Sequence, residues 1–441
     1  MAEQEPKRLL MLCYHFSPSV SGGVERSARF ARYLPEHGWT PLVVTTNRWG
    51  APGGEDDGVL RVGELFRGGR SRVGGRGGAG AGAGSSRDVV DRNGRRAPLF
   101  RFAEKWLLVP DKHVRWTAMA LLPALGKLGR GRADAIYTTS PPASAHVLGL
   151  ILKKLTGKPW IMDLRDPWTL EPLNWYLRAG GARLALERRI ERICFGNADA
   201  IIVTTEEAAL KYRELYPGRA GRIHWIPNGF DAREFEVARS PASAGAYLQD
   251  LEEGCLVISH LGTFCRYTDA PAFPKGFLDA VKKLAGQGVI TNRTCRIIFA
   301  GAMNRETERL VGRYDLGGLI SMTGPVPHIG ALSIMLRSDV LLLYDPNTEG
   351  NYYIHGKLYE YLAAGRWILG VLPAGATRSL LERSGRAIAI ARDDGEEISR
   401  VLVRALRERG HPPGRRDFDL SRYEGRNQAR DLARIIEGAC R

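Results

Sequence analysis

The stretch DAIYTTSPPASAHVLGLILKKLTGKPWIMD, residues 134–163, contains the pattern that decides the fold. Its first run, DAIYTTS, is apolar and rich in β-branched side chains, a helical pattern follows it, and PWIMD is a second apolar run. Strand and helix patterns that alternate in this way are typical of a parallel sheet with crossover helices. We therefore predict an α/β fold for this part of the chain.

The same alternation continues along most of the 441 residues. In the first half we predict strands at 9–16, 41–47, 134–140, 159–163, 199–204 and 222–226. In the second half the predicted strands are LVISHL, RIIFAG, ISMTG, DVLLLY, WILGV and AIAIA. A chain of this length exceeds what one hydrophobic core usually supports, so we expect two Rossmann-like domains that face each other across a cleft.

The domain boundaries are expected where the alternation stops. The first domain should span residues 1–231, and the polar stretch 232–253 should be a hinge. The second domain should span 254–415. The last apolar pattern, within 416–441, predicts a terminal helix that packs back on the first domain.

The chain carries a net charge of +16, part of which comes from an Arg- and Gly-rich tract within residues 61–100. Such a composition cannot bury enough apolar surface to fold, so we predict a disordered basic loop there. A loop that faces a membrane or covers the acceptor is the alternative. The tract has no aromatic residue between Phe66 and Phe100, and we predict no nucleic-acid partner.

A second basic segment, GGARLALERRIERICFGNAD at residues 180–199, predicts an amphipathic helix. Its basic residues are Arg183, Arg188, Arg189 and Arg192. We expect Glu187 and Glu191 to pair with them on a solvated face. Contact with anionic lipid is the alternative.

The segment HGKLYEYLAAG, residues 355–365, is the strongest candidate for chemistry. A polar loop leads into a helix whose first turn holds Gly356, Lys357 and Leu358. A helix N-terminus with a lysine suits a diphosphate. One turn later, Glu360 can accept hydrogen bonds from the hydroxyls of a ribose. The alternative is a surface Lys–Glu pair on a helix that packs in the core.

Several ordered motifs resemble the GT-B glycosyltransferases of the family 4 type. They are SGGVERSARFARYLPEHGW, SPPASAH, DLRDPW, IPNGFD and KLYEYLAAG. The resemblance implies that the second domain binds a nucleotide diphosphate sugar and the first domain binds the acceptor. It also implies transfer with retention of anomeric configuration.

Two departures from the family pattern concern the donor site. The family has two glutamates eight positions apart, but Tyr352 stands where the first is expected, and Glu349 is the candidate substitute. After LVISHL, Thr263 and Thr268 replace the usual Arg and Lys. We expect Arg266 to grip the diphosphate instead, with a solvated loop arginine as the alternative.

The first domain supplies further candidates at the carboxyl ends of its strands. By resemblance, Gly22 and Gly23 close over the donor phosphates, with a tight β–α turn as the alternative. His146 is a catalytic candidate that would meet the acceptor or the leaving diphosphate, or a buried structural histidine.

The motif DLRD contributes the remaining first-domain candidates. Asp163 is a catalytic candidate, and Arg165 and Asp166 are expected to bind the acceptor. An internal Asp163–Arg165 salt bridge is the alternative.

These features together predict a retaining hexosyltransferase whose co-substrate is a UDP- or GDP-sugar. Its acceptor would be a hydroxyl of a glycan, a lipid-linked saccharide or a natural product. A sugar-nucleotide epimerase of the same fold and a non-catalytic basic binding protein stay open as alternatives. We predict no bound cofactor or metal, because the DFD motif, Asp417 to Asp419, is better suited to capping.

Localisation is predicted from the composition and the N-terminus. No apolar run is long enough for a membrane span, and no signal-peptide cleavage pattern follows the first residues. We expect a cytoplasmic protein, with peripheral contact at the inner membrane face left open.

Overall fold

The computed structural model describes residues 6–18, 23–49, 58–65, 102, 106–129, 132–170, 181–240, 243, 254–262, 274–303, 305–345, 352–391, 393–408 and 417–441. It divides into two compact units. Unit 1 contains the chain up to Asn228 together with Gly425–Arg441, and unit 2 contains Gly229–Glu424. No helix among these residues is long and apolar enough to cross a membrane.

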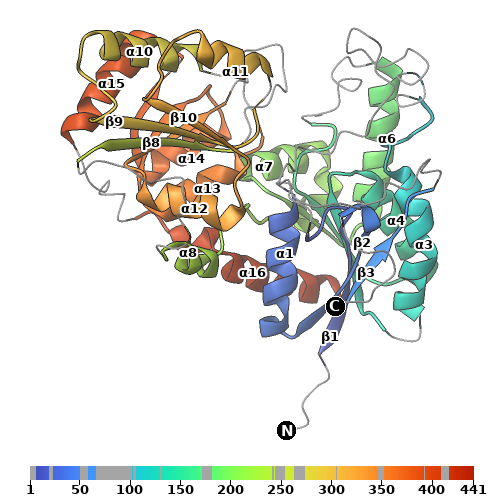
Figure 1. The fold of residues 1–441 in the computed structure, drawn as a ribbon. Helices are drawn as coiled ribbons and strands as arrows, with labels where there is room; N and C mark the ends of the chain where they lie inside the picture. Colours follow the sequence, from blue (N-terminus) through green and yellow to red (C-terminus); the bar gives the residue numbers. More distant parts are fainter. Residues whose placement is uncertain are drawn as a thin grey trace, which may run out of the picture. The chain divides into compact units, whose positions relative to one another are not determined.

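Unit 1 is built on a seven-stranded parallel sheet (Figure 1). Its strands are β1 Lys7–Leu12, β2 Trp39–Thr46, β3 Val59–Val62, β4 Ala135–Ser140, β5 Trp160–Leu164, β6 Ala200–Val203 and β7 Ile223–Trp225. Their order is β3-β2-β1-β4-β5-β6-β7, so the winding direction reverses between β1 and β4. All six predicted strands are present, and β3 is an additional short strand at the sheet edge.

Helices cover both faces of this sheet. They are α1 Val24–Tyr33, α3 Val114–Leu128, α4 Ser144–Thr156, α6 Gly181–Asn197, α7 Glu206–Leu215 and α16 Gly425–Ala439, with short 3-10 turns at Leu34–His37, Asn47–Trp49 and Pro217–Arg222. α1 and α16 pack together in one core. The terminal helix therefore packs on the first sheet, as predicted from the sequence.

Unit 2 has a six-stranded parallel sheet of order β10-β9-β8-β11-β12-β13. Its strands are β8 Leu256–Leu261, β9 Cys295–Ala300, β10 Ile320–Gly324, β11 Val340–Tyr344, β12 Trp367–Val371 and β13 Ala387–Ala391. Its helices are α8 Ala232–Ala238, α10 Lys275–Gly286, α11 Arg305–Gly312, α12 His328–Arg337, α13 Gly356–Ala364, α14 Ala376–Ser384 and α15 Gly395–Arg407, with a 3-10 turn at Leu420–Tyr423.

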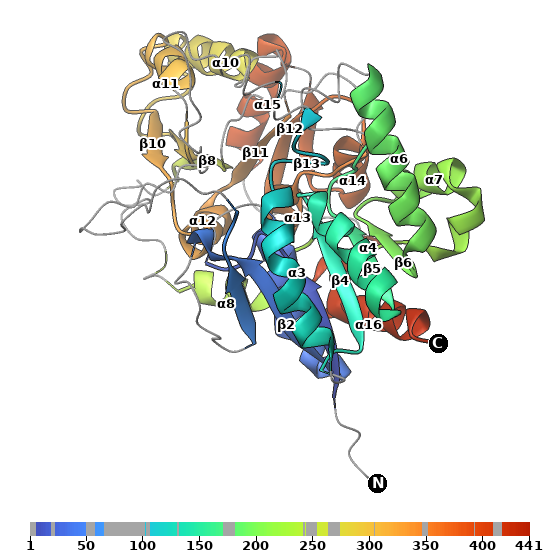
Figure 2. The ribbon, with the colours of Figure 1, turned by 90° about the vertical axis from the view of Figure 1, so that its right-hand side faces the viewer.

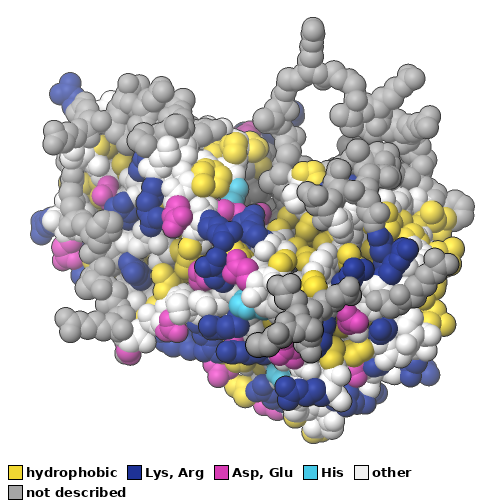
Figure 3. Space-filling model, turned by 90° about the horizontal axis from the view of Figure 1, so that it is seen from below, with side chains coloured by type: hydrophobic (Ala, Val, Ile, Leu, Met, Phe, Trp, Pro, Cys, Tyr) yellow, Lys and Arg dark blue, Asp and Glu magenta, His cyan; other side chains and the backbone are white. Residues whose placement is uncertain are grey.

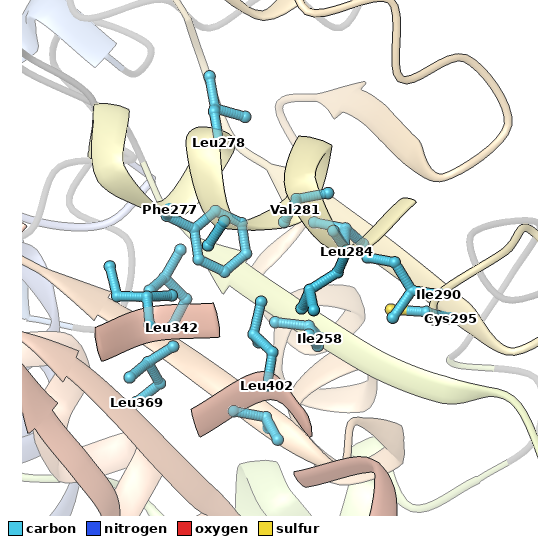
Figure 4. Close-up of a cluster of buried hydrophobic side chains, with 14 of the residues drawn as sticks. Ile258, Phe277, Leu278, Val281, Leu284, Ile290, Cys295, Leu342, Leu369 and Leu402 are labelled. Atoms are coloured by element: carbon cyan, nitrogen blue, oxygen red, sulfur yellow. The ribbon is translucent and has the colours of Figure 1, made fainter. Parts of the chain in front are cut away.

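The strands of unit 2 bury alternate side chains on opposite faces. On one face, Phe277 and Leu284 of α10 and Leu402 of α15 pack on Ile258 and Leu342, as Figure 4 shows. On the other face, α8, α12, α13 and α14 form a second core. Strands buried on both sides explain why their sequences are continuous apolar runs.

The predicted boundaries differ from the observed elements in three places. The range 232–253 begins with helix α8, which packs on α12 within unit 2. The loop predicted for 61–100 begins inside β3, and residues 66–100 lie outside the described part of the chain. Only Gly425 and the residues after it join unit 1.

Candidate functional site

The site in unit 2 lies where the winding of its sheet reverses. β8 and β11 are neighbours there, although β9 and β10 separate them in the sequence. In open parallel sheets, ligands bind at the carboxyl ends of the strands at this switch point. His260 and Gly262 end β8, Asp345 follows β11, and the loop after β11 leads to α13.

The N-terminus of α13 lies at this end of the sheet. His355 is its N-cap residue, and Gly365 ends the helix with a left-handed φ of 69°. The N–H of Leu358 donates to the His355 carbonyl at 2.9 Å. Gly356 and Lys357 come before that bond, and a Cβ added at Gly356 would meet no other atom within 4 Å. The first turn is therefore open to a ligand, with the positive end of the helix behind it.

Leu358 has a structural role in addition to the one expected. Its side chain is fully buried in the core under α13, and its N–H is already bonded to His355. All three first-turn candidates stay predictions for the diphosphate site, with Gly356 and Lys357 lying before the Leu358–His355 hydrogen bond. The Leu358 side chain anchors the helix.

Lys357 is held by a buried histidine at the end of β8. Its Nζ lies 3.3 Å from His260 Nε2, and His260 Nδ1 lies 2.9 Å from the Leu342 carbonyl of β11. A carbonyl only accepts, so Nδ1 carries the proton and Nε2 accepts from the ammonium. Burial, together with the charge of Lys357, lowers the pKa of His260 well below its usual value. His260 therefore stays neutral and positions the lysine.

Glycines bring the ends of β8 and β9 close together beneath Lys357. A Cβ at Gly301 would lie 2.1 Å from the Gly262 carbonyl, and Gly262 has a φ of +110°. A Cβ at Gly262 would lie 3.1 Å from Lys357 Nζ. Larger residues at either position would displace the strand ends or the ammonium.

Glu360 points to a different partner from Lys357. Its Oε1 lies 3.6 Å from Nε2 of His328, and the same nitrogen lies 3.2 Å from Oε2 of Glu234. The Glu360 side chain is 15% exposed. Lys357 and Glu360 thus turn toward different groups, and both lie at the open end of α13.

In unit 1, Asp163 is the centre of a buried hydrogen-bond network. Its two carboxylate oxygens each lie 2.9 Å from the Arg26 guanidinium, and Tyr137 and Thr139 also donate to it. Arg26 donates in addition to the Pro227 carbonyl at 2.7 Å. Asp163 is fully buried, so these contacts occupy its oxygens.

The alternative pairing of Asp163 with Arg165 is wrong. The guanidinium of Arg165 pairs with Asp166 at 2.8 Å and lies over Gly23, where a Cβ would be 2.1 Å from Nη1. Asp163 faces α1, from which Arg26 reaches it, whereas Arg165 follows the end of β5. Gly23 therefore allows Arg165 to approach the N-terminus of α1, and the two together attract negative charge.

His146 lies in the first turn of α4 and is fully buried. Its Nδ1 lies 2.9 Å from Thr138 Oγ1, which also accepts from the Trp160 indole at 2.8 Å. Its Nε2 has no hydrogen-bond partner among the residues described. Burial lowers the pKa of His146 to about 3, so its imidazole is neutral near neutral pH.

Comparison with known proteins agrees with this geometry. Residues 21–229 match the model of the glycosyl transferase 4-like domain family. The first half of the chain is therefore similar to this family, and the chain has the GT-B fold. No curated protein matches its sequence.

Solved structures of other proteins share this fold. Sucrose-phosphate synthase from Thermosynechococcus elongatus aligns with a TM-score of 0.58 at 13% identity, over 98% of this chain and 94% of that one. HepE of Anabaena in complex with UDP and glucose aligns with a TM-score of 0.56 at 14% sequence identity. The alignment covers 98% of this chain and 97% of that one. WaaG, a glycosyltransferase involved in lipopolysaccharide biosynthesis, aligns with a TM-score of 0.56 at 15% sequence identity, over 98% of each chain.

Sequence reasoning missed several residues at the carboxyl edges of the two sheets. Asp345, whose Oδ2 lies 2.9 Å from His355 Nε2, directly follows β11, and its position after a strand was a usable signal. Thr377 lies 3.4 Å from the His355 N–H. His260 gave no signal because it sits within an apolar strand.

A second cluster that sequence reasoning missed surrounds the end of β1. The Tyr14 ring lies 4.2 Å from that of His113 and 5.5 Å from that of Trp116, and its hydroxyl donates to Glu64. Burial is the main cause that lowers the pKa of His15 to about 4 and of His113 to about 3. The predicted strand 9–16 included Tyr14 and His15, so the sequence did not mark them as following a strand, whereas β1 ends at Leu12.

Arg188, Arg189 and Arg192 of α6 are exposed, as expected, but the prediction that Glu187 and Glu191 share their solvated face is wrong. Glu187 and Glu191 are fully buried, as is Arg183, which pairs with Glu187. Trp168 Nε1 donates to Glu187 at 2.8 Å. Glu191 accepts from the Thr169 N–H at 2.8 Å and from the Tyr216 hydroxyl at 2.7 Å. These donors belong to other segments of the chain, and their hydrogen bonds hold the acidic side chains inward. The sequence pattern of the helix alone could not reveal them.

The remaining predictions from the sequence fall into two groups. Gly22, Arg266 and Glu349 lie outside the described residues. The expected capping role of the DFD motif is confirmed for Asp419, whose carboxylate accepts from the Ser421 N–H at 3.0 Å. It caps the 3-10 turn at Leu420–Tyr423, not the terminal helix itself.

Proposed function

We propose that the enzyme is a retaining hexosyltransferase that binds a UDP- or GDP-sugar at the N-terminus of α13. The observation that carries this proposal is the joint arrangement of an open first turn, Lys357 and two close-packed glycines at the switch point of the sheet. A diphosphate is bound by positive charge, by the N-terminal end of a helix and by close backbone approach, and this arrangement combines all three. UDP and UDP-glucose complexes of HepE accord with the choice of donor.

In this proposal Lys357 and the helix N-terminus bind the diphosphate, and Glu360 accepts hydrogen bonds from ribose hydroxyls. Glu360 is partly exposed, and a carboxylate accepts several hydrogen bonds at once. Arg266 is proposed as a further diphosphate ligand and Glu349 as a contact to the donor sugar. Their loops follow β8 and β11, the two strands at the switch point.

The proposed reaction is a front-face displacement. The bond between the anomeric carbon and the diphosphate oxygen breaks, and the acceptor oxygen attacks from the face that the diphosphate leaves. The acceptor proton passes to the departing phosphate oxygen. Lys357 and the α13 dipole stabilise the negative charge that develops on the diphosphate, so the enzyme acts mainly by positioning and electrostatics.

The acceptor is proposed to bind at the carboxyl edge of the unit 1 sheet. Arg165 and Asp166 present a partly exposed ion pair there, next to the N-terminus of α1. We assign the acceptor to the hydroxyl-bearing classes, namely glycans, lipid-linked saccharides and natural products. The neutral His146 would contribute a hydrogen bond, and Asp163 would hold Arg26 and the sheet edge in place.

Two measurements test this proposal. In a thermal-shift screen of nucleoside diphosphates, UDP or GDP should raise the apparent melting temperature, because a ligand that binds only the folded state stabilises it. With a donor sugar labelled at its anomeric carbon, NMR of the product should show the anomeric configuration of the donor. Inversion would overturn the retaining mechanism, and no stabilisation by any nucleoside diphosphate would overturn the donor site.

The epimerase alternative predicts a different product. Mass spectrometry and chromatography of donor plus enzyme without acceptor should show unchanged sugar nucleotide, apart from slow hydrolysis. Stoichiometric conversion into an isomeric sugar nucleotide would replace the transferase proposal.

A further inference from the structure

The His355 imidazole lies at the start of α13, beside a buried carboxylate. His355 is the N-cap residue of the helix, and its side chain is 20% exposed. Its Nε2 lies 2.9 Å from Oδ2 of Asp345, which follows β11 directly and has a fully buried side chain. An ionised carboxylate only accepts hydrogen bonds, so it favours a proton on the ring nitrogen that faces it. Asp345 therefore orients the ring and supports a positive charge on it.

Two further contacts hold the segment that carries His355. The His355 N–H lies 3.4 Å from Oγ1 of Thr377 in α14, and that hydroxyl donates to the Tyr353 carbonyl at 3.4 Å. The Tyr353 ring meets the imidazole edge-on, with the ring centroids 5.4 Å apart. α13 and α14 are neighbours, as Figure 2 shows. The imidazole is therefore preorganised, so a ligand at the start of α13 meets it in one position.

Three basic side chains meet at this helix start, namely His355, Lys357 and His260. Lys357 Nζ lies 3.3 Å from His260 Nε2. Burial, Lys357 and the charge of His355 lower the pKa of His260 well below its usual value. His260 therefore stays neutral, and the positive charge of the group comes from Lys357 and from a protonated His355. Asp345 of the β11 end and Tyr353 of the preceding loop are the other titratable groups that face the His355 ring.

Charges elsewhere on the molecule are mixed in sign. On the face that Figure 3 shows, Lys and Arg side chains are interspersed with Asp and Glu side chains. Exposed charges of mixed sign compensate each other and are screened by salt. We therefore expect selectivity for an anion to come from the local grouping at the start of α13, where Lys357 and His355 join the positive end of the helix.

We propose that His355 is a proton-linked ligand of the donor diphosphate and that Asp345 is its positioning residue. The imidazole takes up a proton from solvent when the diphosphate binds, and the imidazolium contacts a phosphate oxygen beside Lys357. The proton returns to solvent when the diphosphate leaves. An imidazole next to a bound polyanion holds its proton more strongly than without it. The protonated enzyme thus binds the donor better, and affinity falls as pH rises through the range in which imidazole titrates.

This inference rests on the donor site proposed above and adds a dependence on pH to it. Calorimetric titration of the full chain with UDP and with GDP between about pH 5.5 and 8.5 covers the range in which imidazole titrates. Wild-type affinity should fall about tenfold more over this range than that of His355→Gln, because a contacting opposite charge typically favours the charged form by at least about one pH unit. Glutamine stays polar but takes up no proton.

Two other groups titrate in the same range, namely the terminal phosphate of the nucleotide and His328 beside Glu360. Both are present in wild type and in His355→Gln, so the difference between the two proteins isolates His355. Titrations at one pH in buffers of different ionisation enthalpy count the protons. Wild type should take up more protons on binding than His355→Gln does.

Asp345→Asn separates a positioning role from a merely structural one. Removal of the anion makes the imidazole lose its proton more readily, so the decline in affinity should move to lower pH. A carboxylate that only supported the fold would leave this pH window in place. His37→Gln, in the 3-10 turn Leu34–His37 of unit 1, is the matched control and should keep the wild-type profile.

Circular dichroism checks that each variant is folded, and Asp345→Asn decides the question if His355→Gln is not. Equal pH dependence and equal proton uptake in wild type and His355→Gln would overturn this inference and leave the donor site standing. So would an unchanged pH window in Asp345→Asn. Folded wild type that binds neither UDP nor GDP at any pH would overturn the donor site and this inference with it.

Discussion

The carboxyl edges of the two sheets use their charged residues in opposite ways. In unit 1, Asp163 and Arg26 are buried and neutralise each other. In unit 2, Lys357 and Glu360 stand at an open helix N-terminus and remain partly exposed. The two sheets share one architecture, so the difference lies in what each edge must hold. The buried Asp163–Arg26 pair maintains the fold, whereas the partly exposed Lys357 and Glu360 are suited to a charged ligand.

Asp163→Asn would test the structural half of this comparison and should give the largest effect. Removing the charge leaves the Arg26 guanidinium buried without its counter-ion, which typically costs about 3 to 5 kcal/mol of unfolding free energy. Urea unfolding of wild type and variant measures the difference. Glu214→Gln, which removes an exposed ion pair with Lys211, is the control and should cost less than about 1 kcal/mol.

A stable Asp163→Asn variant that lacks transferase activity would break the comparison. It would move Asp163 from a structural role to a direct role in the reaction. The fully buried carboxylate and its four donors argue for the structural result.

The buried carboxylate of Glu187 should make stability depend on pH. Burial raises its pKa from 4.5 to about 7, although Arg183 acts in the opposite direction. Between these two values the folded state keeps a proton that the unfolded state has lost, so stability falls as pH rises through this window. The change is on the order of 2 to 3 kcal/mol. Unfolding curves across this pH range should show this decline in wild type and a smaller slope in Glu187→Gln; equal slopes would exclude Glu187 as the source.

His260→Phe should produce the smallest of these effects, at the open edge. Phenylalanine keeps the ring volume but removes the acceptor for Lys357 and the donor to Leu342. We expect nucleoside diphosphate affinity to fall by about 1 kcal/mol, because Lys357 loses its support. Calorimetry measures it, and His224→Phe in β7 is the matched control. If both variants bind equally well, Lys357 does not need His260 for its position.

The alternation of apolar runs and helical patterns was sufficient to predict the fold class. Buried parallel strands such as VLLLY and LVISHL must be apolar throughout, so they are easy to recognise. The strand β3, VLRV, was missed because it has only four residues, includes an arginine and lies at the sheet edge. The start of α8 was assigned to a hinge because its polar sequence hides the buried Phe235.

The candidate site was only partly predictable. Gly356, Lys357 and Glu360 could be found because a helix start after a strand is a local feature. The partner of Asp163 could not, because Arg26 is 137 positions away and only the packing of α1 brings it there. The same limit applies to Glu187 and Glu191, whose partners come from other segments. Periodicity predicts which residues share a face of a helix. It does not predict which hydrogen-bond donors of other segments pack against that face.

Calorimetric titration with UDP and with GDP tests most directly whether the N-terminus of α13 binds the donor nucleotide. Wild type should bind at least one of them, and Lys357→Ala and Glu360→Ala should each lose about 1 to 3 kcal/mol through the missing phosphate and ribose contacts. Lys283→Ala, which removes an exposed ion pair with Glu396 elsewhere in unit 2, should bind like wild type. Affinity that stays unchanged in both Lys357→Ala and Glu360→Ala would contradict the account.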